Sequence, residues 1–177
     1  MQDASEQHPI QFFTATILEW KHLLKPDKYK DIIIESLRYL TAEKRIEVFS
    51  FIIMPNHIHL IWRIGENSKR ENVQRDFLKF TSQQIIKDLE KNHPLVLEKF
   101  KVDAKDRAYQ VWERNALTVD IYSREVLEQK LDYIHNNPVQ EKWQLSAEAE
   151  DYKYSSIRFY ENESTEWEFL KRYENEI

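Results

Sequence analysis

The sequence of 177 residues contains no cysteine and only one glycine, Gly65. Without cysteine the chain can form no disulfide and carry out no thiolate chemistry, which is typical of proteins from reducing compartments. With one glycine, its sharp turns must rely on Asn, Asp, Pro and Ser. No apolar run is long enough to cross a bilayer, and the polar, acidic start MQDASEQHPI does not resemble a signal peptide. We therefore expect a cytoplasmic protein with no membrane partner.

A net positive charge, which is common in proteins that bind nucleic acids, is also absent, because the formal net charge is −5. The acidic excess lies at one end of the chain. Residues 141–177 hold 10 of the 31 acidic and 5 of the 26 basic side chains, which leaves 21 of each in residues 1–140. A neutral body can still carry a local basic surface, so the net charge argues only weakly against nucleic-acid binding.

The remaining composition is that of an ordinary globular protein, with 41% hydrophobic and 32% charged residues. The length suits one domain, and the sequence contains no repeat, low-complexity tract or clear linker. We therefore treat residues 1–177 as a single domain. Its core is expected over about residues 10–140, followed by a C-terminal extension over 141–177.

Hydrophobic patterns predict the order of the secondary structure. Strands are expected at 10–20, 46–54, 57–64 and 109–121, the last with a possible break near Arg114 and Asn115. Helices are expected at 28–42, 70–91 and 124–136, with an irregular segment at 92–107. The apolar stripe of the second helix is Val73, Phe77, Phe80, Ile85 and Leu89. The order β-α-β-β-α-β followed by a helix predicts an α+β, ferredoxin-like sandwich with an antiparallel sheet, plus a C-terminal helix and tail.

Two histidines, His57 and His59, are separated by one residue on the third predicted strand. Side chains alternate along a strand, so both imidazoles project from one face, and Arg63 shares that face. Two adjacent imidazoles can bind a metal ion, although two ordinary histidines in a β-hairpin would give the same pattern. A Mg²⁺ or Mn²⁺ ion would need further oxygen ligands from protein, phosphate or water.

The last predicted helix carries Tyr133 and Asn137 four residues apart, so they share one face with Lys130. A phenol has a pKa near ~10 and becomes a nucleophile only where its anion is favoured, as beside a metal and a cation. The amide oxygen of Asn137 could supply a third metal ligand. Alternatively, the tyrosine simply packs at the helix end and the asparagine caps that end.

Four segments resemble one family of DNA enzymes. IIMPNHIHLIW (52–62) and LDYIHNNPV (131–139) resemble the signature motifs of the tyrosine HUH single-strand transposases, and most of all the REP-associated tyrosine transposases. VWERN (111–115) and EDYKYSSIRFY (150–160) resemble segments that flank those motifs in that group. All four stand in the order typical of the family.

This resemblance implies roles for individual residues. His57, His59 and Asn137 match the metal ligands, for Mg²⁺ or Mn²⁺, and Tyr133 matches the catalytic tyrosine. The family implies that this tyrosine attacks a phosphate of single-stranded DNA that bears a hairpin. The products would be a 5′-phosphotyrosine bond and a free 3′-OH, which later rejoins a strand. Members of the wider family act as monomers or homodimers.

Further contacts with DNA are expected from Arg63, Arg114, Lys130 and His135, of which His135 could instead be structural. Tyr152, Tyr154 and Phe159 of the extension are expected to dock on the domain. Two other hypotheses remain open from the sequence. One is a non-catalytic single-stranded nucleic-acid-binding protein derived from a transposase. The other is a metal-dependent hydrolase that uses water as its nucleophile and does not act on DNA.

Overall fold

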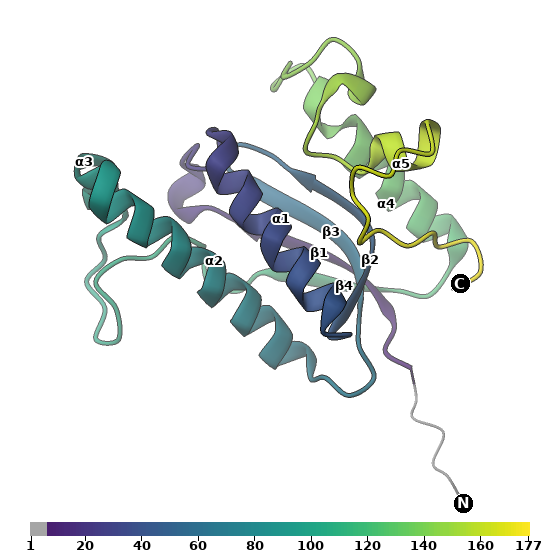
Figure 1. Cartoon of the computed structure of the whole chain (residues 1–177), viewed down its shortest axis with the longest axis horizontal. Coiled ribbons are helices and arrows are strands. Elements are labelled where there is room, and N and C mark those ends of the chain that lie inside the picture. The colour runs from purple at the N-terminus through teal and green to yellow at the C-terminus, as the bar shows by residue number, and fades with distance from the viewer. Residues whose placement is uncertain (1–6) are drawn as a thin grey trace, which may run out of the picture.

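The structure is a computed structural model that describes residues 7–177 (Figure 1). Its main elements are β1 (Ile10–Thr16), α1 (Asp27–Ala42), β2 (Ile46–Ile53), β3 (His57–Ile64), α2 (Arg70–Asn92), α3 (Pro94–Leu97), β4 (Leu117–Ile121), α4 (Arg124–Asn136) and α5 (Ile157–Glu161). Single turns of 3-10 helix lie at Leu18–Trp20, Glu98–Phe100, Asn137–Val139 and Ala149–Asp151. The strands form one antiparallel sheet in the order β2-β3-β1-β4. The predicted α+β sandwich, with its additional helix α4, is confirmed.

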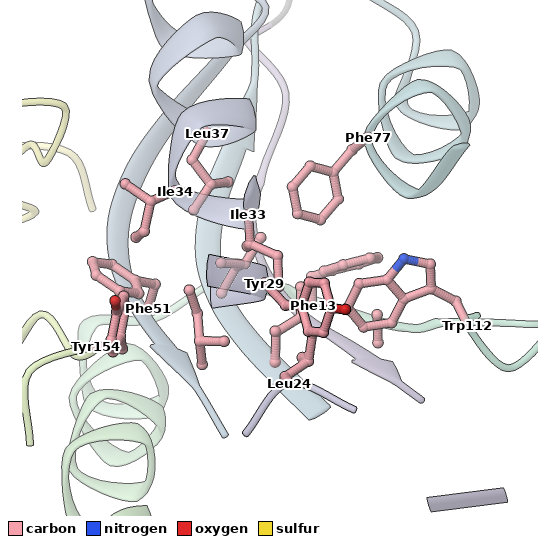
Figure 2. Packing of buried hydrophobic residues seen from close by; sticks show 14 of the residues in the cluster. Phe13, Leu24, Tyr29, Ile33, Ile34, Leu37, Phe51, Phe77, Trp112 and Tyr154 are labelled. Carbon is pink, nitrogen blue, oxygen red and sulfur yellow. The ribbon is translucent and has the colours of Figure 1, made fainter. Parts of the chain in front are cut away.

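One face of the sheet is covered by α1 and α2. Figure 2 shows Ile33 and Leu37 pointing from α1 into this core, while Phe77 points into it from α2. The ring of Phe77 meets Phe13 of β1 at 6.4 Å between centroids, in an edge-to-face arrangement. Each such side chain contributes about 1.5–3 kcal/mol by leaving water, so this layer anchors the sheet.

The opposite face of the sheet packs against α4 and the C-terminal extension. Ser123 caps α4 by accepting a hydrogen bond from the backbone N–H of Val126, as predicted for this helix. Leu127, Leu131 and Ile134 then project from α4 into the second core. Because both faces are covered, every residue of β3 is buried, and the strand lacks the usual alternation of buried and exposed residues.

The C-terminal extension runs along the outer edge of β2. Backbone hydrogen bonds join it to that strand from Ile53 N–H to Tyr154 O, from Ser156 N–H to Phe51 O and from Lys171 N–H to Val48 O. The hydroxyl of Tyr152 donates to the carbonyl of Ile53 at 2.6 Å. The predicted docking of the aromatic residues is thus confirmed. A strand edge that would otherwise be free is covered by the chain itself.

Two predicted strands are too long. β1 ends at Thr16, because Glu19 and Trp20 adopt positive φ angles of 54° and 57° and turn the chain. β4 begins at Leu117, since Asn115 has a φ angle of 61°. A break at that asparagine was predicted, but the residues before it form only isolated bridges and no ladder.

The structure also corrects two details of the second helix and its continuation. Phe80 is 45% exposed, and Thr81 takes its place in the buried stripe. The Thr81 hydroxyl donates to the carbonyl of Phe77 and accepts from the indole of Trp112, so this polar group is satisfied. The segment after α2 is less irregular than predicted, because α3 and a 3-10 turn bury Leu97 and Phe100. None of the described helices is long and apolar enough to cross a membrane.

The single glycine occupies a position where no other residue fits. A Cβ atom on Gly65 would lie 2.1 Å from the backbone oxygen of Lys44, so the contact requires glycine. Turns with positive φ use other residues, and within the described chain these are Glu19, Trp20, Lys44, Asn115, Gln144 and Glu163. Only one of them belongs to the turn-forming types predicted from composition.

Candidate metal and tyrosine site

The histidine pair lies on the face of β3 that is turned toward α4. In the antiparallel register His59 stands opposite Thr14 and His57 opposite Thr16. The two rings are 4.7 Å apart between centroids, and each side chain is only about one-twentieth exposed, at 6% for His57 and 5% for His59. Ile58 between them enters the other core. The predicted common orientation of the two imidazoles is confirmed.

Hydrogen bonds orient both rings. The amide nitrogen of Asn56 donates to the carbonyl of Trp20, so its Oδ1 accepts from Nδ1 of His57 at 2.7 Å. This leaves Nε2 of His57 with a lone pair. Nδ1 of His59 lies 2.7 Å from the hydroxyl of Thr14, while its Nε2 is buried and has no hydrogen-bond partner in the described chain. Such outer partners are how proteins aim the ligating nitrogen of a histidine.

Burial keeps both imidazoles neutral. Loss of solvent lowers the pKa of His57 to about 4, helped by the nearby ammonium of Lys142. The pKa of His59 falls to about 3, again through burial first, then through His57, Lys130 and Lys142. A neutral imidazole is the ligand form, so at neutral pH no proton competes with a metal ion for these nitrogens.

Tyr133 projects from α4 beside this pair. Its ring meets His59 edge-on at 5.3 Å and Phe12 at 6.3 Å between centroids, yet the side chain remains 44% exposed. Leu131 and Ile134 hold the same turn of α4 on the sheet. The phenol is therefore fixed at its base and open to a ligand at its tip, whereas a tyrosine that simply packs would be covered.

Asn137 follows one helical turn later and is 2% exposed. It occupies the C-cap position of α4, as the capping alternative expects, and its backbone N–H bonds to the carbonyl of Ile134. Its side chain, however, forms no capping hydrogen bond, whereas the side chain of the neighbouring Asn136 donates to the carbonyl of Asp132. Oδ1 of Asn137 is buried and unpaired within residues 7–177. A buried carbonyl oxygen without a partner costs about 1–3 kcal/mol, which the capping hypothesis leaves unexplained.

The donor set fits a divalent metal only in part. The described residues contain no group of three or more His, Cys, Asp or Glu that could hold a metal ion. The available donors are the two imidazoles and the amide oxygen of Asn137, with one orphaned atom in His59 and one in Asn137. Two nitrogens and one oxygen suit Mn²⁺ or a similar ion better than Mg²⁺, with phosphate and water completing the shell.

Two residues of the loop after α4 lie at this site and have no counterpart in the sequence prediction. The ring of Trp143 lies 5.7 Å from His57, and the Lys142 ammonium lies 6.0 Å from the centre of the Trp143 ring. They belong to the loop after α4, which carries no periodic pattern. Asn56 could have been found, because it stands directly before His57 in the motif and its amide is a natural partner for a histidine.

The predicted DNA contact of Arg63 is wrong. The residue shares the sheet face of the histidines, as its parity requires, but is only 3% exposed. Its guanidinium pairs with Glu176 at 2.9 Å and with Glu47 at 3.2 Å, and it lies over the ring of Phe49. The C-terminal extension therefore covers Arg63, and the side chain is part of the structure.

Replacing Arg63 by methionine should lower stability and leave DNA binding unchanged. Removal of a buried, doubly paired cation is expected to lower the free energy of unfolding by about 2 kcal/mol, measured by urea denaturation. Arg114 is exposed and serves as the matched control. Arg114→Met should leave stability within about 0.5 kcal/mol of the wild type and weaken binding of single-stranded DNA. Weaker DNA binding by folded Arg63→Met would contradict the assignment.

His135 is also buried and therefore not available for a DNA contact. It is 6% exposed, and its Nε2 lies 2.8 Å from the hydroxyl of Ser156, which in turn lies 2.8 Å from the hydroxyl of Ser50. This buried network joins α4 to β2 and to the extension. Burial lowers the pKa of His135 to about 4. Of the two roles expected for His135, a DNA contact or a structural role, the structure supports the structural role.

The three buried imidazoles, His57, His59 and His135, should make the protein sensitive to acid. Their folded pKa values of about 4, 3 and 4 lie below the ordinary 6.5, so below that pH the unfolded chain binds protons that the folded chain does not. Stability is therefore fully present above pH 6.5 and is lost as the pH falls towards 4. Each imidazole should contribute a loss of about 2 kcal/mol between pH 7.5 and 5.

Urea denaturation in EDTA at the two pH values measures this loss. The variant His135→Gln keeps a hydrogen-bonding group for Ser156 but does not titrate. Its stability should therefore fall by about 2 kcal/mol less than that of the wild type over the same range. An equal loss in both proteins would show that His135 does not contribute.

Of the predicted DNA contacts, Lys130 and Arg114 remain accessible. The ammonium of Lys130 lies 4.8 Å above the ring of Phe12, one helical turn before Tyr133. Arg114 follows Glu113, whose N–H bonds to the carbonyl of Thr16, the register partner of His57. Both cations thus lie at the histidine end of the sheet.

Comparison with known proteins identifies the class of the fold. The chain resembles a solved structure described as a REP-associated tyrosine transposase bound to a REP hairpin, with a TM-score of 0.62 at 17% identity, over 89% of this chain and 82% of that one. A structure from Deinococcus radiodurans R1, of a protein whose assignment as a transposase is itself inferred, gives 0.49 at 12% identity, over 77% and 96%. No family model and no curated protein matches the sequence.

The first likeness shows an α+β fold of the transposase type. In particular, the chain has the fold of the REP-associated tyrosine transposase over 89% of its length. That is the group whose motifs the histidine strand and the tyrosine helix resemble. The fold and the motifs therefore agree.

Proposed function

We propose that this protein cleaves and rejoins single-stranded DNA, with Tyr133 as the nucleophile. One observation carries the proposal: an accessible phenol lies edge-on, 5.3 Å between ring centroids, to a buried histidine whose Nε2 is unpaired. A phenol at the margin of a potential metal site can attack a group bound there, which an ordinary surface tyrosine cannot do.

The metal would be held by His57, His59 and Asn137. In support of this, both imidazoles are held neutral, and His59 Nε2 and Asn137 Oδ1 are buried without a partner among the described residues. A bound Mn²⁺ or Mg²⁺ would polarise the scissile phosphate and favour the charge that develops on it. The protein supplies the orientation, through Asn56 and Thr14, and the exclusion of water from the far side of the imidazoles.

The chemical step exchanges one phosphodiester bond for another. The phenolic oxygen of Tyr133 forms a bond to phosphorus as the bond to the 3′-oxygen of the preceding nucleotide breaks. The phenol proton passes to solvent, to which this side chain is open, and the departing 3′-oxygen takes up a proton. The products are a 5′-phosphotyrosine and a 3′-OH, and attack by a 3′-OH reverses the step without an external energy source.

Two accessible cations flank this step. Lys130 lies on the Tyr133 side, and Lys142 lies on the His57 side. Within the described chain neither forms an ion pair, so both ammonium groups can meet phosphates. This local positive charge can attract the phosphates of DNA, although the net charge of the chain is negative.

The proposed substrate is DNA that bears a hairpin, because the structural neighbour is described as bound to a REP hairpin. The test is incubation of the purified protein with a labelled hairpin oligonucleotide carrying single-stranded flanks, with Mn²⁺ or with EDTA, followed by a denaturing gel. We expect a covalent DNA–protein band with Mn²⁺ only, which mass spectrometry should map to Tyr133.

Other outcomes of this experiment would favour other functions. Binding without any cleavage would favour a non-catalytic nucleic-acid-binding protein. Cleavage without a covalent band would favour a hydrolase that activates water. Either result, obtained with metal present, would contradict the proposed mechanism.

A further inference from the structure

Two exposed apolar side chains lie on β4, the edge strand of the sheet, two strands away from the histidine pair. Leu117 is 55% exposed and Val119 is 39% exposed, although both belong to a strand of the central sheet. Scattered apolar residues on a surface are normal, but these two are alternate residues of β4, so their side chains lie next to each other on one face of the sheet. We call this surface, formed by Leu117 and Val119 with Phe12 beside them, the β4 shelf.

The sheet register places the shelf next to the candidate site. Leu117 stands opposite Thr14, which stands opposite His59 on its other side. These three residues form one transverse row across neighbouring strands. Strands are about 4.8 Å apart, so Leu117 lies about 10 Å from His59 in the plane of the sheet. The next row places Val119 opposite Phe12, whose ring stacks on His59 at 5.2 Å.

The helix α4 borders the shelf with three side chains of one stripe. Val126 is 38% exposed, Lys130 lies over Phe12 at 4.8 Å, and Tyr133 completes the stripe beside His59. The acid of β4, Asp120, accepts a hydrogen bond from Gln11 on the opposite sheet face. The shelf therefore combines an aliphatic floor with one cation at its border.

This combination matches an unpaired nucleotide better than a protein partner. A nucleobase offers an apolar face of suitable size, and the phosphate attached to it meets a lysine. A paired base would be stacked inside a duplex and could not lie flat on a strand.

We infer that the β4 shelf binds an unpaired nucleobase next to the scissile phosphate, an inference that rests on the proposed function. Leu117 and Val119 contact the face of the base, and Lys130 contacts its phosphate. The site would thereby select single-stranded over double-stranded DNA at the point of cleavage. An aliphatic floor also favours apolar contact with a thymine methyl group over hydrogen-bonded readout of a base edge.

The test compares two fluorescent 20-nucleotide probes by anisotropy, in the Tyr133→Phe background with Mn²⁺. Both carry the same hairpin; one has a single-stranded flank of mixed sequence, and the other has an abasic flank with the same number of phosphates. The double variant Leu117→Thr with Val119→Thr keeps strand-forming residues while removing the apolar floor. It should bind the probe with the normal flank about three- to tenfold more weakly and the probe with the abasic flank equally well. Lys130→Gln should weaken binding of both probes by the same factor.

A matched control is the double variant Leu95→Thr with Val96→Thr. These residues are 83% and 37% exposed and lie in α3, at the end of α2 remote from α4 (Figure 1). This control should bind both probes as the parent protein does. Thermal unfolding of all variants checks that each is folded.

The outcomes separate this inference from the proposed function. If the parent protein binds neither probe, the proposed function fails. If it binds both, and the shelf variant binds the probe with bases as tightly as the parent protein does, the shelf inference alone is overturned. A shelf variant that changes only the oligomeric state, measured by light scattering, would identify the shelf as a contact between copies of this chain and would also overturn the inference.

Discussion

Replacement of Tyr133 by phenylalanine is expected to reduce cleavage of hairpin DNA by at least about 10³-fold and to abolish the covalent band. The change removes a single oxygen, the atom that would bond to phosphorus. The ring, its edge-on contact with His59 and its contact with Phe12 all remain. Because the hydroxyl lies on a 44% exposed side chain and forms no hydrogen bond in the described structure, stability should change by less than about 0.5 kcal/mol.

Tyr122 provides the matched control. It is 79% exposed, lies just before α4, and its hydroxyl donates to Asp120. Tyr122→Phe should therefore retain full cleavage. Affinity for DNA, measured by anisotropy, should be the same in both variants, because neither change removes a positive charge. Persistent cleavage by Tyr133→Phe would mean that water or another group attacks the phosphate, and the assignment of the nucleophile would fall.

The sequence predicted the order of the elements and the central geometry of the site. Strand parity placed His57 and His59 on one face of a strand, and helical spacing placed Tyr133 and Asn137 on one face of a helix. Both patterns depend only on neighbours along the chain, so they survive in any fold that contains the strand and the helix. The meeting of the two elements depended on the family resemblance, because no local rule brings residue 133 to residue 59.

The predictions that failed depend on contacts between distant segments. Arg63 has the correct parity for the site, but Glu176 arrives from 113 residues away and buries it. His135 was ambiguous until Ser156, 21 residues later, supplied its partner. In both cases the C-terminal extension decides whether a polar side chain meets DNA or protein. Its docking could be expected from its aromatic residues, but the residues it would cover could not.

The same reasoning explains the charge of the chain. The acidic extension lowers the net charge to −5, but one of its acids, Glu176, is engaged with Arg63 and Lys171. The cations near the candidate site, Lys130 and Lys142, form no ion pair within the described residues. A neutral or acidic net charge is therefore compatible with a locally basic site. The distribution of ion pairs shows which cations stay unpaired, which the net charge does not.

Addition of Mn²⁺ to the metal-free protein is expected to raise its thermal unfolding midpoint by about 5–10 °C. Free metal at one hundred times its dissociation constant stabilises a folded site by about 2.7 kcal/mol, and a domain of this size gains about 2–4 °C per kcal/mol. A strong effect is expected because folding alone already buries and orders the proposed ligands. His59 and Asn137 are buried with unpaired donor atoms, so a metal ion would satisfy groups that folding alone leaves without partners.

The variant His59→Leu should lose this rise completely while remaining folded. Leucine is of similar size and removes the unpaired Nε2, and the hydroxyl of the half-exposed Thr14 can turn to water. Stability without metal should therefore match or exceed that of the wild type, because a buried polar atom without a partner is replaced by an apolar group. DNA cleavage should be lost together with the rise in the unfolding midpoint. His59 would then lower the stability of the metal-free protein but be necessary for activity.

His93→Leu is the control for this measurement. His93 is exposed, lies at the end of α2 and contacts only Lys28 among the described side chains. It should keep the full rise with Mn²⁺, whereas Asn137→Leu, which loses one of the three proposed donors, should keep a part of it. An equal rise in His59→Leu and the wild type would place the metal elsewhere on the protein. The orphaned atoms would then need another ligand, and the link between Tyr133 and a metal-bound phosphate would be lost.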